Sequence, residues 1–192
     1  MRYDKKKSIY SAAASLFGEK GFERTSLDEV ARKAGVAKGT IFYHFQSKDK
    51  LFSELIREGI EEMTRRIDAI AAMDASAEKK IDLVVEFHFE FFKDNRDMCH
   101  MILGQMGNFQ KRWQQNIELI RGSYLRSMEK IIAEAKRENV ISRSFDTDSL
   151  IITLFSLLAV SAIDWAIFHP EIPAKNMAKT VKMLLSKGLK EK

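Results

Sequence analysis

Apolar residues recur at helical spacing along most of the chain. Residues 8–20 place Ile9, Ala12, Ala13, Leu16 and Phe17 on one side, which predicts an amphipathic helix with one buried stripe. A longer stripe begins after residue 48 and continues through Leu51, Leu55, Ile56, Ile60, Met63, Ile67 and Ile70. The pattern therefore predicts a short first helix and a long helix that follows residue 48.

Start and stop signals divide the region between these two helices into short pieces. Gly21 suits the end of the first helix, because glycine adopts the left-handed backbone that helix ends require. Ser26 followed by Glu29 is a capping-box pattern that opens a second helix, and Gly35 ends it. A third short helix is predicted at about residues 37–45, with Ile41, Phe42 and Phe45 as apolar core anchors.

The segment 81–93 is ambiguous, because its phenylalanines alternate with polar residues as in a strand but also fit a helical face. We favour a helix, since no other segment offers a lone strand a partner. Further helices are predicted at 98–106, 109–138 and 150–168, and a last one starts at Pro173. The expected fold is all-α, with about nine helices and no repeats. We place the domain boundary between residues 1–47 and 48–192.

Positive charge is concentrated at the N-terminus. The chain carries a net charge of +5, and residues 1–57 account for all of it, with 12 Lys and Arg against 7 Asp and Glu. Local positive charge is what polyanion binding needs, although a solvated surface with chance asymmetry fits the count equally well. The chain has one cysteine, Cys99, and its basic start lacks the apolar run of a signal peptide. We expect a cytoplasmic protein.

Residues 27–51 combine these signals into the layout of a helix-turn-helix, in which the second helix enters the DNA major groove. The chain here resembles the TetR (tetracycline-repressor) family of bacterial regulators. The matching segments are 12–17, 21–22, 25–26, 29–31, 34–36, 38–45 and 48–51, in order and spacing. The resemblance covers about the first 50 residues, and the remainder is similar to the family only in the number and length of its helices.

The resemblance implies that three N-terminal helices bind DNA and that the fourth links them to a ligand-binding and dimerising body. Many family members have Ser where Ala37 stands, so we expect the third helix, the recognition helix, to begin with a weaker cap. The family uses the positions of Tyr43 and His44 mainly for phosphate contacts. Taken alone, Tyr43 also fits a half-buried core aromatic and His44 an ordinary surface histidine.

Each of the other predicted DNA contacts has a chemical reason. Gly39 lacks a Cβ and so permits close approach to the sugar-phosphate backbone, while Lys38 and Thr40 lie on the first turn, which reaches base edges. Thr25 and Ser26 precede a helix N-terminus, which attracts phosphate. The remaining candidates are Lys48, for the backbone of the same half-site, and Val36 and Ala37, for thymine methyl groups.

The body beyond residue 48 is rich in large, soft side chains. As a group, these residues favour an adaptable pocket for a small apolar or aromatic effector, although an ordinary core explains any single one of them better. The candidate ligand-binding residues are Phe87, His88, Phe91, Met101, Gln105, Trp113, Asp164 and Trp165. His88, His100, Asp164 and Gln105 supply polar groups that could orient the ligand.

Residues 150–168 are very apolar, but the uncharged run ends at Asp164, which is too short for a bilayer. We therefore expect a buried helix and no membrane. In the family the last two helices pair with a second subunit, and a homodimer is implied here. The residues that suit this seam are Leu154, Leu157, Leu158, Ser161, Ala162, Val181, Leu184 and Gly188.

No nucleotide-binding loop, nucleophile elbow, paired catalytic carboxylates or metal-ligand spacing is present. We predict no enzyme, no catalytic residue, no metal site and no cofactor. The favoured function is a homodimeric repressor that binds a palindromic DNA operator and releases it when the effector binds. The alternatives are a dimeric ligand-binding or interaction module that does not bind DNA, and an activator of the same architecture.

Overall fold

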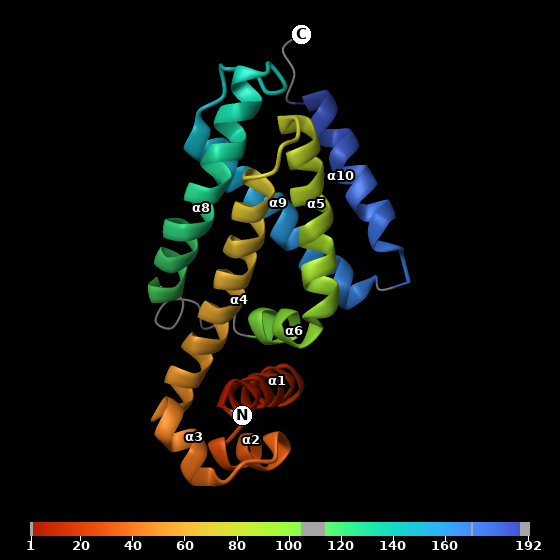
Figure 1. Ribbon diagram of the computed structural model, residues 1–192. Coiled ribbons are helices and arrows are strands. Elements are labelled where there is room, and N and C mark those ends of the chain that lie inside the picture. Colours follow the sequence, from red (N-terminus) through yellow and green to blue (C-terminus); the bar gives the residue numbers. More distant parts are fainter. Residues whose placement is uncertain (1, 105–113, 170, 189–192) are drawn as a thin grey trace. The chain divides into compact units, whose positions relative to one another are not determined.

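The computed structural model describes residues 2–104, 114–169 and 171–188, and this part of the chain is helical without a strand. Its helices are α1 (Arg2–Lys20), α2 (Leu27–Ala34), α3 (Lys38–Phe45), α4 (Lys48–Ala71), α5 (Ala77–Asp94), α6 (Arg96–Gly104), α8 (Gln114–Arg137), α9 (Thr147–Phe168) and α10 (Ala174–Gly188) (Figure 1). The all-α prediction is confirmed. The ambiguous segment 81–93 lies inside α5, so the choice of helix over strand was correct.

The chain forms two compact units that do not follow chain order. The first contains Met1–Gly59 and Asn95–Glu118, and the second contains Ile60–Asp94 and Leu119–Lys192. Helix α4 passes from the first unit into the second, while α6 belongs with the N-terminal helices. The boundary after residue 47 divides the chain by its order in the sequence, and it stays a prediction.

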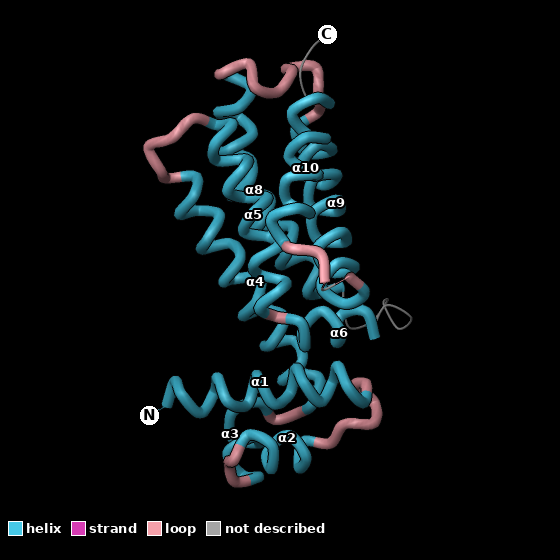
Figure 2. Tube along the Cα trace, turned by 90° about the vertical axis from the view of Figure 1, so that its right-hand side faces the viewer, coloured by secondary structure: helices cyan, strands magenta, loops and turns pink. Residues whose placement is uncertain are grey.

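In the first unit, the predicted caps define the short helices. Gly21 and Gly35 have φ angles of 83° and 67°, which glycine adopts without strain. The Ser26 hydroxyl accepts the Glu29 backbone N–H at 3.2 Å, and the Glu29 carboxylate accepts the Ser26 N–H at 2.9 Å. The predicted capping box is therefore present, and it sets the start of α2, which packs against α1 and α3 (Figure 2).

Helices α1 and α6 also pack closely in the first unit, at Gly18. A Cβ at Gly18 would lie 3.1 Å from both the Asp97 carbonyl oxygen and the His100 Cβ. This spacing is tighter than ordinary van der Waals contact, so a larger residue would push the two helices apart. Gly18 therefore allows the close approach of α6 to α1.

The second unit is built around α5, which packs against α9 and α10. Phe89 of α5 meets Trp165 of α9 with ring centroids 5.8 Å apart, and the Trp165 indole N–H donates to the Ile172 carbonyl at 2.8 Å. The buried Lys80 ammonium donates to both carboxylate oxygens of Glu134 at 2.8 and 2.7 Å, which joins α5 to α8. The Phe89–Trp165 contact and the Lys80–Glu134 ion pair are therefore among the interactions that hold the second unit together.

Helix α9 is the one described helix that is long and apolar enough to cross a membrane, by length and composition alone. The core helix of a water-soluble protein passes the same test, and here one side of α9 is buried against its own unit, including Leu154, Leu158, Ala162 and Trp165. Asp164 interrupts the other side. These features fit the predicted buried helix.

A fully buried histidine also links α5 to α8. The His88 Nδ1–H donates to the Val84 carbonyl at 2.7 Å, because that oxygen can only accept. The Tyr124 hydroxyl then donates to His88 Nε2, 3.0 Å away. Burial lowers the His88 pKa from 6.5 to about 4, so the ring is neutral at neutral pH.

This buried histidine predicts an acid-dependent loss of stability. The unfolded chain takes up a proton on His88 below pH 6.5, whereas the folded chain does so only near pH 4. The free energy of unfolding should therefore fall by up to ~3 kcal/mol between these pH values from His88 alone. Urea unfolding of wild type and His88→Gln across this range measures the difference. An equally steep fall in the variant would contradict the assignment.

Candidate DNA-binding interface and effector region

The recognition helix α3 begins without a side-chain cap. Ala37 is its N-cap residue, with an extended backbone and no side-chain hydrogen bond, which agrees with the weaker cap predicted from the sequence. The backbone N–H of Thr40 donates to the Ala37 carbonyl at 2.9 Å. At the start of α3, the exposed residues are Ala37, Lys38 and Gly39, so Lys38 is the one long side chain among them.

The two sides of α3 have different roles. Ile41 and Phe45 are buried, with 0% and 1% of their surface exposed, whereas Tyr43 is 74% exposed. The prediction that Phe42 belongs to the core is wrong, because 43% of its surface is exposed. Residues four apart share one helical face, and Phe42 is turned away from the face of Ile41 and Phe45. Its ring instead lies 5.8 Å from the Lys38 ammonium.

The exposed side of α3 presents most of the residues predicted to contact DNA. Ala37, Lys38 and Gly39 are exposed, and Thr40 is half-buried beside them. A Cβ at Gly39 would meet no atom within 4 Å, so the fold itself does not require glycine here. Val36 and His44 are half-buried at either end of this surface.

The hydroxyl groups of Thr25 and Ser26 are engaged within the protein. Thr25 is 2% exposed, and its hydroxyl lies 3.1 Å from the Leu16 carbonyl and 2.9 Å from the Gly21 carbonyl. The Ser26 hydroxyl takes part in the capping box. Their phosphate contacts stay predictions, and the hydroxyl geometry favours a role in ordering the loop before α2.

Lys48 also has partners that the sequence did not indicate. Its ammonium donates to the carbonyls of Phe22, Glu23 and Thr25 at 2.8, 3.1 and 2.9 Å, and it lies 4.5 Å from the Phe22 ring centroid. An ammonium group has three protons, so these bonds use its full donor capacity. Lys48 fastens the loop before α2 to the start of α4, and its DNA contact stays a prediction.

The predicted effector residues are placed less uniformly. On α5, Phe91 is buried and Phe87 half-buried, with their ring centroids 5.8 Å apart, and His88 lies between them in the chain. Trp165 is 2% exposed in the same unit. These four residues therefore lie in the second unit, and their contact with a ligand stays a prediction.

The other effector candidates do not join this group. Met101 is buried in α6 of the first unit. The Asp164 side chain is 60% exposed and lies 4.0 Å from His169. Gln105 and Trp113 lie outside the described residues. Helical spacing alone could not separate the inner and outer faces of α9, because apolar residues lie on every side of this helix.

Cys99 is fully buried in α6, and burial raises the pKa of its thiol to about 12. The thiol is therefore protonated at neutral pH and is a poor nucleophile. Cys99 serves as a core side chain in the first unit.

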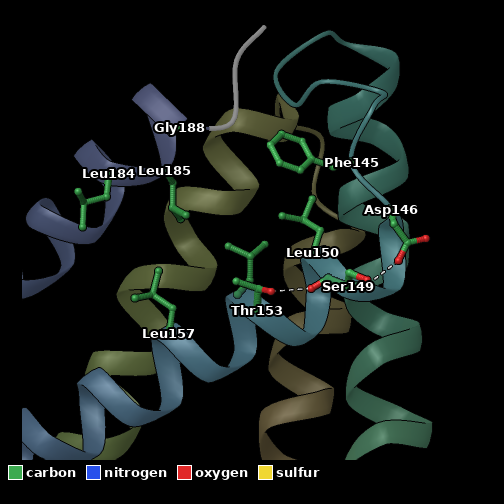
Figure 3. Close-up of a pocket in the computed structure, with 10 residues that line it drawn as sticks. Phe145, Asp146, Ser149, Leu150, Thr153, Leu157, Leu184, Leu185 and Gly188 are labelled. Carbon is green, nitrogen blue, oxygen red and sulfur yellow. Dashed lines mark hydrogen bonds between the residues drawn. The ribbon is translucent and has the colours of Figure 1, made fainter.

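A groove with a volume of about 370 Å³ lies between the start of α9 and the end of α10. Figure 3 shows Leu150 and Leu157 of α9 facing Leu184 and Leu185 of α10 along it. Leu184 is 60% exposed. The groove thus leaves an uncovered apolar surface on the last two helices.

Half of the residues predicted for the dimer seam are buried within the subunit itself. The buried members are Leu154, Leu158, Ala162 and Val181. Leu157 and Ser161 are half-buried, and Leu184 and Gly188 are exposed. Ile152 and Val160 add exposed apolar surface on α9 that the prediction missed. The seam residues were chosen on composition, which cannot distinguish the two apolar faces of α9.

Sequence comparisons cover almost the whole chain. The profile of the bacterial regulatory proteins of the tetR family matches residues 9–55, and that of the YsiA-like protein C-terminal region matches residues 52–188. The fatty acid metabolism regulator protein of Bacillus subtilis is 22% identical over 96% of this chain and 95% of its own. The biofilm operon negative transcriptional regulator IcaR of Staphylococcus aureus is 26% identical over 78% of this chain and 79% of its own.

Solved structures show the same fold. The transcriptional regulator FadR from Bacillus subtilis, in complex with stearoyl-CoA, has a TM-score of 0.82 and 23% identity, covering 95% of this chain and 98% of that one. The match to the tetR-family profile includes the exposed helix α3 and its buried anchors Ile41 and Phe45. The chain belongs to the TetR family of bacterial transcriptional regulators, a family of DNA-binding proteins rather than enzymes.

Proposed function

We propose that this regulator is a cytoplasmic homodimeric repressor that leaves a palindromic operator when an acyl compound binds its second unit. The observation that carries the proposal is the division of α3, in which Ile41 and Phe45 are buried while Lys38, Gly39 and Tyr43 are exposed. A helix anchored in this way can enter the major groove with its N-terminal side chains toward the bases.

The exposed residues of α3 divide by chemistry. Lys38 and Thr40 reach base edges, and Val36 and Ala37 contact thymine methyl groups beside them. Tyr43 and His44 bind phosphates further along the helix. This surface is supported by hydrogen bonds of Thr25, Ser26 and Lys48. Their polar groups order the loop before α2 and connect it to the start of α4.

The effector is the second part of the proposal. The FadR relative is described in complex with stearoyl-CoA, and the Bacillus subtilis relative is named a fatty acid metabolism regulator. Phe87 and Phe91 contact each other on α5, and Trp165 contacts Phe89 of the same helix, so α5 carries aromatic surface that would suit a long acyl chain. An acyl chain can shift the operator equilibrium only if it binds the released state more tightly than the bound state.

The dimer is the third part. The groove between α9 and α10 exposes apolar surface at Leu184, and Ile152 and Val160 continue it on α9. We propose that a second copy covers this surface by packing α9 and α10 against their counterparts, as in a four-helix bundle. Two recognition helices would then face two half-sites of one operator.

Gly39→Ala tests the DNA surface without disturbing the fold. The added methyl group meets no protein atom within 4 Å, and alanine favours a helix over glycine by ~1 kcal/mol. We expect an unchanged or slightly higher melting temperature together with weaker operator binding in a gel shift. A variant that binds the operator as well as wild type would contradict close approach of Gly39 to DNA.

Stearoyl-CoA tests the effector. An operator is first obtained by selecting binders from random duplexes with the wild-type protein. Stearoyl-CoA, kept below its micelle concentration, should weaken binding to that operator, whereas coenzyme A alone should not. At 100 times its dissociation constant the ligand should also add ~2.7 kcal/mol to the stability of the DNA-free protein. If stearoyl-CoA changes neither operator affinity nor thermal stability, the effector proposal fails.

Leu184→Glu tests the dimer. The side chain is 60% exposed in the subunit, so the change should leave the fold intact while placing a charge in the proposed interface. We expect the variant to sediment as a monomer and to lose most of its operator affinity. Met73→Glu is the matched control, because Met73 is 46% exposed in the turn after α4 and does not line the groove between α9 and α10. Equal sedimentation of both variants and wild type would refute this interface.

A further inference from the structure

An exposed ion pair joins the two helices of the helix-turn-helix. The Lys38 ammonium, on the first turn of α3, lies 2.8 Å from the Asp28 carboxylate, on the first turn of α2. The two side chains are 61% and 51% exposed, so solvent or DNA can reach both. Asp28 is an unexpected residue here, because a carboxylate repels DNA phosphates.

We propose that the Asp28–Lys38 pair recognises a single C·G base pair in each half-site of the operator. Lys38 is one of the predicted DNA contacts, whereas Asp28 is not. The proposal rests on the proposed operator binding and adds to it a residue of α2 that sets base specificity.

The pair matches the major-groove edge of C·G in both chemistry and spacing. Cytosine presents the N4 amine as a donor, and guanine presents O6 and N7 as acceptors. The N4 and O6 atoms are joined by a Watson–Crick hydrogen bond, so they lie about 2.9 Å apart. That separation is close to the 2.8 Å between the Asp28 oxygen and the Lys38 nitrogen. Asp28 can therefore accept from N4 while Lys38 donates to O6.

Other base pairs fit the Asp28–Lys38 pair less well. An A·T pair also places a donor beside an acceptor, N6 of adenine beside O4 of thymine. However, adenine N7 then lies next to N6 and would repel the carboxylate, and the thymine methyl group occupies the side on which guanine offers N7. Lysine can bridge O6 and N7 of guanine, so C·G gains one contact and avoids one repulsion.

The pair is held in place by its neighbours. Lys38 also lies 5.8 Å from the Phe42 ring centroid, so the ammonium is placed between an aromatic face and a carboxylate. The capping box of Ser26 and Glu29 sets the start of α2 directly before Asp28. An exposed ion pair contributes little to folding, so its removal tests recognition rather than stability.

The first experiment compares base preferences. Wild type, Asp28→Ala, Lys38→Ala and Asp28→Asn are each used to select operators from random duplexes, and circular dichroism confirms that each variant is folded. We expect a position in the wild-type half-site where C·G is preferred at least about tenfold. Both alanine variants should lose that preference. Asp28→Asn should shift it toward A·T, because asparagine binds adenine through N6 and N7.

A matched control removes a similar carboxylate elsewhere in the first unit. Glu19 lies 3.1 Å from Lys33, and the two side chains are 58% and 41% exposed, but this pair joins α1 to α2 rather than α2 to α3. Glu19→Ala should keep the wild-type base preference. Asp28→Ala should also bind random DNA more tightly than wild type, since a phosphate-repelling charge is lost, while its preference for the operator falls.

Base analogues then assign the two contacts. A 2-pyrimidinone in place of the cytosine lacks the N4 amine, and 7-deazaguanine lacks N7. The first should weaken binding by wild type but not by Asp28→Ala, and the second should weaken binding by wild type but not by Lys38→Ala. If Asp28→Ala keeps the C·G preference, or wild type prefers A·T there, the inference is wrong. If wild type selects no sequence at all, the proposed function itself fails.

Discussion

The burial of Ile41 and Phe45 is the constraint on which the DNA-binding surface depends. Both side chains are fully enclosed, and the Phe45 ring lies 5.7 Å from that of Tyr10 on α1. Because α3 is only two turns long, these two anchors determine its rotation. Lys38, Gly39 and Tyr43 are exposed as a direct consequence, and the same rotation brings Phe42 to the surface.

Polar groups in the first unit are largely satisfied within the protein, and this shapes how the unit meets DNA. Lys48 binds three carbonyls, Lys20 pairs with Glu29, and Lys33 pairs with Glu19. These bonds fix the loop before α2 and the angle between the helices. Some of the positive charges in residues 1–57 therefore stabilise the first unit through internal contacts, in addition to any attraction of the unit to phosphate.

The second unit shows how an apolar helix divides its surface. One face of α9 packs against α5, and the opposite face exposes Ile152 and Val160. A helix that is apolar all round needs a second partner for its outer face, and the second copy of the chain that we propose there would meet that need. The polar link between His88 and Tyr124 lies on the inner side, where it joins α5 to α8.

The sequence by itself determined the local structure. The caps at Gly21, Ser26 and Gly35, the helical fold and the family were all readable, because each depends on residues close together in the chain. Only the tertiary structure decided that α6 packs on α1 at Gly18, that Phe42 is exposed, and that Lys48 and Asp28 have the partners described. Those contacts join residues from different helices, and several involve backbone carbonyls, so no spacing in the sequence records them.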